Sequence, residues 1–288
     1  MAAEIRSTDS PDGNQQAVSA MDSLPPLPAI ALRVVQVVQD PNSSAGELAT
    51  VVSADPGLSA QFLRVANSAA YRRSNEVSSV KEALVLIGFS QARNLAIGGA
   101  IATAFPPDAL HALFRIETFW RHSLAVAFQA GRIAQKLNSV DVATAFTAGV
   151  LHDIGRLAMF HADPSGLDQA VAKHLAGEGT LEEIELEVLG YSHGEVGGRL
   201  AGQWGLPEDV TEAITLHHEA DLDPKTLPGV IATADQFCMA AGFHSGVEHP
   251  APMGTEPEVL SAEAEKLHGE VNGLTAMIRG ASAGVTTT

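Results

Sequence analysis

Hydrophobic side chains recur every three to four positions along most of the chain, and residue types that begin or end helices interrupt them. After Asp55 and Pro56, the side chains of Leu58, Phe62 and Val65 share one helical face. Aspartate caps helix N-termini, and proline suits the first helical position because its missing N–H would have no partner there. The pattern predicts a helix that begins at Pro56.

Two further segments begin with the Ser-x-x-Glu pattern of a capping box, in which each of the two side chains bonds to the other residue's backbone N–H. One runs from Ser79 to a stop at Gly88, and the other runs from Ser192 to near Gly205. A third helix is predicted from Pro207, because two acidic residues follow it in the first turn, where they suit the helix dipole.

These signals extend over most of the chain, and no alternating run is long enough to predict a sheet. We therefore predict an all-α fold in which many medium-length helices pack as a layered array. The proline-containing segment 104–113 is the candidate boundary between two helical subdomains. The predicted units are a flexible tail (1–22), an N-terminal helical subdomain (23–107), a second helical subdomain (108–245), and an acidic linker with a helix and a loose C-terminus (246–288).

The charge, the apolar segments and the cysteine content indicate which partners the chain can bind and in which compartment it is found. The 288 residues carry a formal net charge of −17, with 8 basic and 10 acidic residues in 1–115 against 9 and 24 in 116–288. Nucleic acid and anionic membranes bind clustered basic residues, so we expect neither as a partner. The most apolar stretch, 95–105, is far shorter than the ~20 residues of a membrane helix, and no signal peptide is evident. With one cysteine, the chain is predicted to be cytoplasmic.

Histidine and aspartate side chains occur on faces that the hydrophobic pattern turns inward. His122 shares a helical stripe with Phe119 and Val126, and Asp235 lies between Ile231 and Cys238 on another. Burying an ionised carboxylate is costly unless it is paired or binds a metal. Taken singly, such residues are more often hydrogen-bonded core residues than ligands, so the set matters more than any member.

Five further residues of this kind lie at the ends of predicted helices: His152, Asp153, His193, His217 and His218. Asp153 closes an apolar helical segment two positions before Gly155, which we expect to end that helix in the left-handed conformation. Together with His122 and Asp235, these residues form a candidate site of seven nitrogen and oxygen donors.

Two groups of motifs resemble the HDOD-domain family. The first part of the chain contains Leu-Pro-Pro-Leu-Pro, Asp-Pro-Gly-Leu and Ala-Asn-Ser-Ala in that order, and the second contains WRHSLAVA, GVLHDIGRL and ITLHH. The resemblance extends from Leu24 to Phe243. It implies two packed helical subdomains, the second of which is similar to the HD superfamily of metal phosphohydrolases.

The resemblance also implies a metal site. The positions that match the ligands of the HD superfamily are His122, His152, Asp153 and Asp235. Those that match the additional ligands of cyclic-di-GMP phosphodiesterases of the HD-GYP type are His193, His217 and His218. A divalent Mn, Fe, Co or Zn ion suits such a set better than Ca, which prefers oxygen ligands.

The sequence departs from the HD-GYP pattern at two places. Gly-x-Gly-Tyr-Pro is absent after His218, and the lysine of His-Asp-x-Gly-Lys is replaced by Arg156. The catalytic residues implied by the resemblance are Asp153, which could bridge two metal ions, and Arg156, which could neutralise phosphate charge. Metal-bound water could then attack a phosphoester.

Two functions remain open. HDOD proteins are generally regarded as bacterial signalling modules without a common catalytic activity, so the first is a non-catalytic regulatory module that binds a signalling protein or a small ligand. The second is a metal-dependent phosphohydrolase of unknown substrate. Nucleic-acid binding is a third, but a solvated helix face explains the basic residues concerned more simply: Arg64, Arg72, Arg73, Lys81 and Arg93. We favour the first.

Overall fold

The computed structural model describes residues 29–40, 42–67, 71, 76–102, 113–247, 265, 267–269 and 271–272. Its helices are α2 (Ala29–Gln39), α3 (Ala45–Ser53), α4 (Pro56–Ala66), α5 (Val80–Ile87), α6 (Phe89–Ala102), α7 (Ile116–Leu137), α8 (Val142–Leu151), α9 (Ile154–Ala162), α10 (Pro164–Leu175), α11 (Leu181–Leu189), α12 (His193–Gln203), α13 (Glu208–Leu216) and α14 (Leu227–Ala240).

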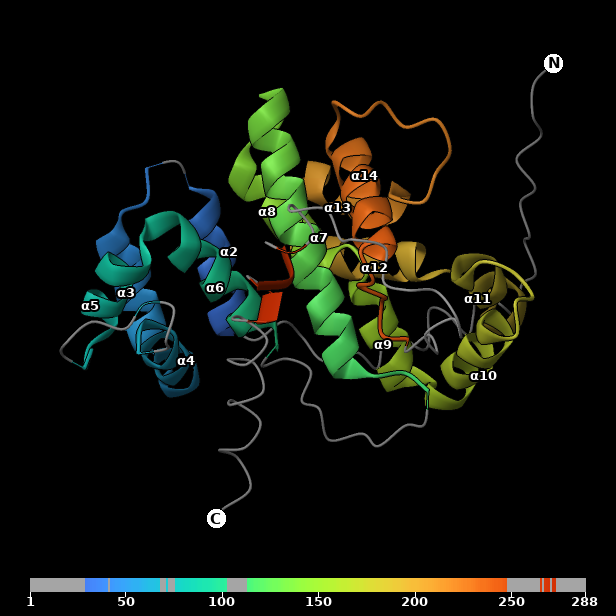
Figure 1. The fold of residues 1–288 in the computed structure, drawn as a ribbon, viewed down its shortest axis with the longest axis horizontal. Helices are drawn as coiled ribbons and strands as arrows, with labels where there is room; N and C mark the ends of the chain where they lie inside the picture. The colour runs from blue at the N-terminus through green and yellow to red at the C-terminus, as the bar shows by residue number, and fades with distance from the viewer. Residues whose placement is uncertain are drawn as a thin grey trace, which may run out of the picture.

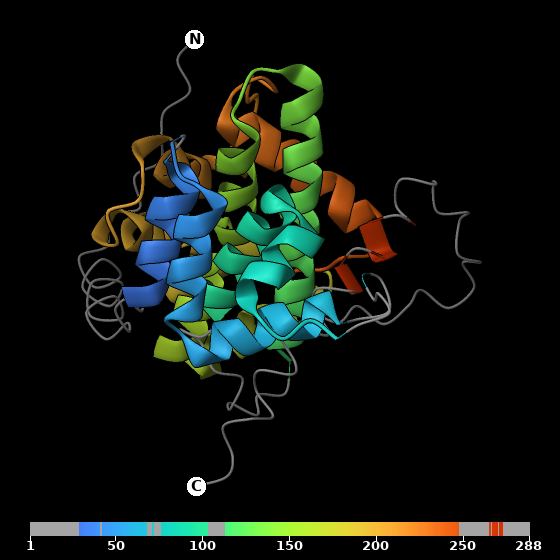
Figure 2. The ribbon, with the colours of Figure 1, turned by 90° about the vertical axis from the view of Figure 1, so that its left-hand side faces the viewer.

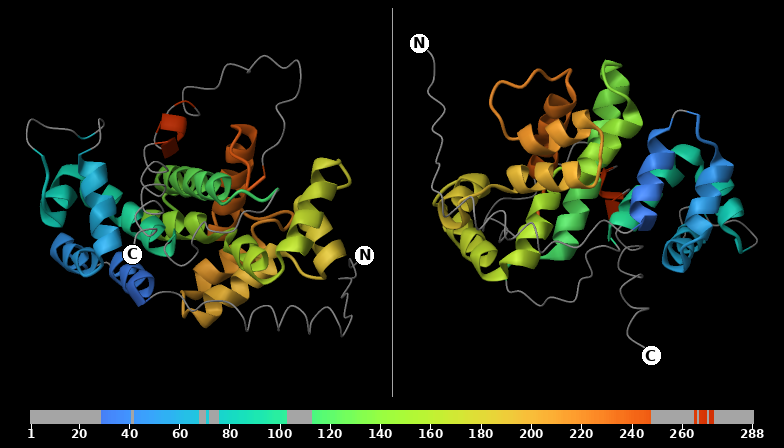
Figure 3. Two further views of the ribbon diagram at one scale, coloured as in Figure 1. Left: turned by 90° about the horizontal axis from the view of Figure 1, so that it is seen from below. Right: turned by 180° about the vertical axis from the view of Figure 1, so that it is seen from behind.

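The helices α2 to α6 gather at one end of the molecule, and α9 to α14 form the other end, with α7 and α8 between them (Figure 1). Figure 2 faces the first group, and both views of Figure 3 show the same separation. The helices α2 and α6 pack on α8, while α14 packs on both α7 and α8. One hydrophobic core extends through both groups, from Phe62 in α4 through Trp120 in α7 to Ile231 in α14.

The predicted all-α class is confirmed. Among the residues that the structure describes, strand-like pairing is limited to one isolated bridge between Phe114 and Val247. None of the described helices is both long and apolar enough to cross a bilayer.

The predicted boundary in 104–113 and the predicted tail over 1–22 lie outside the described residues, except for Leu113. Of the segment 246–288, the structure describes its first two residues and six later helical ones, of which Leu267 and Val271 are buried.

Helix starts follow the predicted caps, with one correction. The Asp55 carboxylate accepts the Leu58 N–H at 2.7 Å, and α4 begins at Pro56. The capping box at Ser192 is complete. At α5, Ser79 accepts the Glu82 N–H, but the Glu82 carboxylate accepts the N–H of Ser78 instead of Ser79. The predicted capping box is therefore only half formed: the bond to the Ser79 side chain is present, and the return bond between the Glu82 carboxylate and the Ser79 N–H is not.

The prediction that Gly155 ends a helix is also wrong. The helix α8 ends at Leu151, and Gly155 lies in the first turn of α9. A Cβ atom at this position would lie 1.9 Å from the carbonyl oxygen of His193 and 2.8 Å from the nitrogen of Gly197, both in α12. Glycine is required here because the backbones of α9 and α12 touch, and this contact brings Asp153 close to His193.

Candidate metal centre

The structure brings all seven sequence-predicted donors together in one site. Five of them are almost fully buried, Asp235 is 9% exposed, and His218 lies at the exposed edge of the cluster. They come from the start of α7 (His122), the junction of α8 and α9 (His152 and Asp153), the first residue of α12 (His193), the end of α13 (His217 and His218) and the middle of α14 (Asp235).

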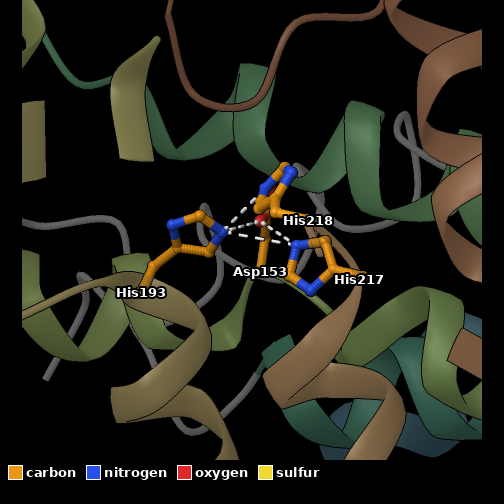
Figure 4. Close-up of side chains that lie close together, drawn as sticks. All are labelled: Asp153, His193, His217 and His218. Carbon is orange, nitrogen blue, oxygen red and sulfur yellow. Dashed lines mark hydrogen bonds and ion pairs between the residues drawn. The ribbon is translucent and has the colours of Figure 1, made fainter. Parts of the chain in front are cut away.

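Four of the donors form one group: Asp153, His193, His217 and His218. Figure 4 shows their side chains pointing toward one another from three parts of the chain. The Nε2 atom of His193 lies 3.1 Å from Asp153 Oδ1, 3.3 Å from His217 Nε2 and 3.1 Å from His218 Nε2. The Asp153 Oδ1 to His217 Nε2 distance is 3.5 Å.

The other three donors, His122, His152 and Asp235, form a second group beside the first. The Nε2 atom of His122 lies 3.1 Å from both His152 Nε2 and Asp235 Oδ1. The His152 Nε2 to Asp235 Oδ1 distance is 4.0 Å. The Oδ2 atom of Asp153 is 3.6 Å from His122 Nε2 and 3.4 Å from His152 Nε2, so the two groups meet at this carboxylate.

Hydrogen bonds made by Nδ1 determine that Nε2 is the histidine nitrogen that faces the centre of the site. Three rings point Nδ1 at a backbone carbonyl at 2.8–3.0 Å: His122 at Phe243, His152 at Gly149 and His217 at Ile214. A carbonyl oxygen only accepts hydrogen bonds, so each Nδ1 carries a hydrogen, and in the neutral rings each Nε2 presents a lone pair. Lone pairs and carboxylates then face one another, and this arrangement is stable only around a proton or a metal cation.

Asp153 has two differently placed oxygens. Its Oδ2 accepts hydrogen bonds from the Arg156 guanidinium, at 2.5 Å, and from the Ser245 hydroxyl. Its Oδ1 is buried without a hydrogen-bond donor in good geometry, although it faces His193 and His217. An orphaned buried carboxylate oxygen beside three imidazoles is a donor set that suits a first-row transition metal, and the site therefore fits such an ion.

Two residues of the site were missed by the sequence reasoning. Glu185 is fully buried, and its Oε2 accepts from the backbone N–H and from Nδ1 of His193, at 3.0 and 2.5 Å, while its Oε1 accepts from Arg156 Nε at 3.0 Å. A signal for it existed, because Glu185 lies four residues from both Leu181 and Leu189 on the buried face of α11. Ser245 lies in a loop after α14, where no periodic pattern could have indicated it.

The pKa values of the histidines are spread apart. Burial and the neighbouring imidazoles lower the pKa of His217 to about 4 and that of His218 to about 2, so both rings are neutral. Burial and Arg156 oppose protonation of His193, but the Glu185 and Asp153 carboxylates outweigh them and raise its pKa to about 9. Despite burial, Arg156 and the adjacent imidazoles hold the pKa of Asp153 well below its ordinary value. Without metal, His193 therefore carries the proton of its group.

A family model for the HDOD domain matches residues 24–220, which is more than half of the chain. The chain belongs to the HDOD family. Among curated proteins, this HDOD protein is similar to an uncharacterized protein of Treponema pallidum, with 24% identity over 78% of this chain and 44% of that protein. It is also similar to ribonuclease Y of Thermus thermophilus, with 34% identity over 42% of this chain and 16% of that enzyme. The HDOD chain thus matches less than half the length of either relative.

Solved structures share its fold. An HDOD domain protein of unknown function from Geobacter sulfurreducens has 24% identity and a TM-score of 0.68, over 97% of this chain and all of that one. A candidate signal-transduction protein from Marinobacter aquaeolei has 24% identity and a TM-score of 0.72, over 97% of this chain and 68% of that one. A candidate phosphohydrolase from Shewanella amazonensis has 26% identity and a TM-score of 0.67, over 93% of this chain and 98% of that one.

Proposed function

We propose that this HDOD protein is a regulatory module of bacterial signalling in the cytoplasm, whose HD-like half holds a divalent metal and does not hydrolyse phosphoesters. In this role it binds a signalling protein or a small ligand. The observation that carries the proposal is the position of Arg156. Its side chain is 6% exposed and lies between the carboxylates of Asp153 and Glu185.

A catalytic role for Arg156 would require its guanidinium to reach a phosphate. To do so it would leave two buried carboxylates unpaired, and breaking a buried ion pair in this way costs about 3–5 kcal/mol. The same ion pair uses Asp153 Oδ2, the oxygen that a metal-bridging aspartate would need. The arginine therefore stabilises the junction of α9 and α11 and limits what Asp153 can bind.

The metal-binding part of the proposal rests on the donors that the chain retains. The residues that would hold an ion are the seven histidine and aspartate donors, and a bound divalent ion lowers the pKa of a coordinated water to about 7. Around it, backbone carbonyls and Glu185 fix the ring orientations, as outer-shell partners of metal ligands do.

A second candidate function is a metal-dependent phosphohydrolase, and one observation favours it. All the donors that match HD-superfamily ligands are present and converge. The similarity to ribonuclease Y and to a candidate phosphohydrolase of known structure is consistent with this alternative. The missing Gly-x-Gly-Tyr-Pro segment and the buried Arg156 count against cyclic-di-GMP as its substrate.

Turnover by the purified protein separates the two functions. Wild type loaded with Mn, Fe or Zn is assayed against bis(p-nitrophenyl) phosphate, cyclic-di-GMP and a short RNA, beside a folded double variant, His152→Ala with Asp153→Ala. We expect no turnover above that of the double variant. Robust turnover by wild type alone would make the protein an enzyme.

The regulatory role has its own test in cells. In a strain that lacks this protein, we expect the double variant to restore the wild-type phenotype as long as its circular dichroism spectrum shows that it is folded. Loss of complementation by a folded, partner-binding variant would tie function to metal chemistry and contradict the proposal.

A further inference from the structure

The two donor groups of the site are not equivalent. One contains four donors, of which one is an orphaned carboxylate oxygen, and the other contains three. The number of donors in each group determines how many metal ions the chain can hold, which group binds the ion and whether protein ligands alone complete its coordination shell.

The four-donor group has the dimensions of a tetrahedral shell. With zinc–ligand distances of 2.0–2.1 Å, neighbouring donors of a tetrahedral ion lie about 3.3–3.4 Å apart, against about 2.9 Å around an octahedral ion. Four of the six donor–donor separations in this group are 3.1, 3.1, 3.3 and 3.5 Å, and all six are within 4.8 Å. Three imidazoles and one carboxylate oxygen at these distances suit zinc.

Hydrogen bonds at Nδ1 also fix the ring orientation of two of the four donors. Glu185 Oε2 accepts from Nδ1 of His193 at 2.5 Å, and the Ile214 carbonyl accepts from Nδ1 of His217 at 2.8 Å. Carboxylate–histidine–metal and carbonyl–histidine–metal arrangements are the usual outer shell of zinc ligands. The Nε2 lone pairs are therefore held toward the centre of the group.

Among the residues that the structure describes, the second group contains three donors and no fourth. Asp153 Oδ2 lies 3.6 Å from His122 Nε2 and 3.4 Å from His152 Nε2, but it already accepts hydrogen bonds from Arg156 and Ser245. With that oxygen engaged by Arg156 and Ser245, the second group offers three donors where the first group offers four. The Arg156 guanidinium brings a fixed positive charge to the oxygen that a second ion would use.

We propose that the chain holds a single zinc ion in a closed four-coordinate shell of Asp153, His193, His217 and His218, and that Arg156 takes the place of a second ion. This inference rests on the proposed metal-binding regulatory function and deepens it. A closed shell of four protein ligands is typical of structural zinc sites, whereas catalytic sites keep one position open for water or substrate.

Metal content and coordination test the inference without an activity assay. Protein freed of metal by chelation is titrated with zinc, and bound metal is measured by mass spectrometry after gel filtration. We expect one zinc per chain, and substitution with Co(II) should give the intense visible absorption of a tetrahedral ion. Two ions per chain, or the weak spectrum of an octahedral ion, would overturn the inference.

A matched pair of ligand variants locates the ion. His218→Ala removes a donor of the four-donor group at its exposed edge, and we expect zinc affinity to fall by about 100-fold or more. His122→Ala removes a donor of the other group and should change zinc affinity by less than about tenfold. The reverse order would place the ion with His122, His152 and Asp235. If His218→Ala does not fold, His218→Cys retains a ligand and should add a sulfur-to-cobalt charge-transfer band.

The role of Arg156 is tested by removing the two side chains that donate hydrogen bonds to Asp153 Oδ2. In Arg156→Met with Ser245→Ala, we expect a second ion to bind, so that the stoichiometry rises from one to two. A stoichiometry of one in the folded double variant would overturn the role given to Arg156. Phosphoester turnover by the one-zinc wild type would contradict the proposed function alone, whereas two ions without turnover would contradict this inference alone.

Discussion

Asp153 carries different partners on its two oxygens, and this asymmetry distinguishes the two halves of the site. Oδ2 accepts from Arg156 and Ser245, while Oδ1 faces His193 and His217 and accepts no hydrogen bond in good geometry. A carboxylate that bridges two ions would present both oxygens equally. The chemistry of this one residue is therefore set by Arg156, which stands where the HD-GYP pattern has a lysine.

Metal affinity should depend on pH through His193. Below its pKa of about 9 the ring is protonated, and zinc must displace that proton, while His217 and His218 are already neutral. We expect zinc to bind about tenfold more tightly for each pH unit between about 6 and 9, and to level off above. Competition with a chelating dye across this range measures the slope, and a flat profile would show that no proton is displaced.

Glu185→Gln should weaken zinc binding by about 10- to 100-fold, because the neutral amide no longer polarises Nδ1 of His193. The comparison belongs above pH 9, since the variant also lowers the pKa of His193 and so reduces proton competition at neutral pH. Glu187→Gln, an exposed position on the same helix paired with Lys173, is the control and should bind zinc as wild type does. Equal affinities of all three proteins would exclude a role for Glu185.

At the level of single residues, sequence could predict the histidines and aspartates but not everything that orients them. His122 and Asp235 interrupt apolar stripes, which is a local signal. Glu185 interrupts one too, but a single buried glutamate has many explanations until its partners are known. The contact of Ser245 with Asp153 joins residues 92 positions apart, and no local pattern encodes such a contact.

Most of the candidate metal-binding residues lie at the ends of helices. His152 is the C-cap of α8, Asp153 the N-cap of α9, His193 the first residue of α12 and His217 the C-cap of α13. Helix starts could be predicted at Asp55 and Ser192 because a cap is a contact within four residues. Gly155 was wrongly predicted to end a helix, because its actual role depends on α12, which lies about forty residues further along the chain.

A pair of glycine variants tests this helix contact. Gly155→Ala would place a Cβ atom against the backbone of α12, so we expect it to lower the free energy of unfolding by about 2–4 kcal/mol and to weaken zinc binding. Gly202→Ala, within α12, meets no atom within 4 Å and should raise stability by about 0.5–1 kcal/mol. Urea unfolding measures both. If Gly155→Ala left the free energy of unfolding unchanged, α9 and α12 could move apart without a loss of stability.

At the scale of the whole molecule, all seven candidate donors come from the segment between α7 and α14, which lies in the strongly acidic part of the chain. The helices α2 to α6 supply no donor, but α2 and α6 pack on α8, and the hydrophobic core is shared. The all-α class could be predicted because helical periodicity is local. The packing of α2 and α6 on α8 could not, since it depends on shape complementarity between distant segments.

Metal removal should therefore loosen one part of the molecule more than the other. A ligand at about 100 times its dissociation constant stabilises the native state by about 2.7 kcal/mol, and stripping it should lower the melting temperature by about 4–5 °C. The lost ion had joined α9, α12 and α13, so hydrogen exchange should accelerate there while α3 to α5 stay protected. His218→Ala without metal serves as the control and should change no further on chelation. Uniform acceleration in all helices would show that the ion supports global folding instead of the local junction.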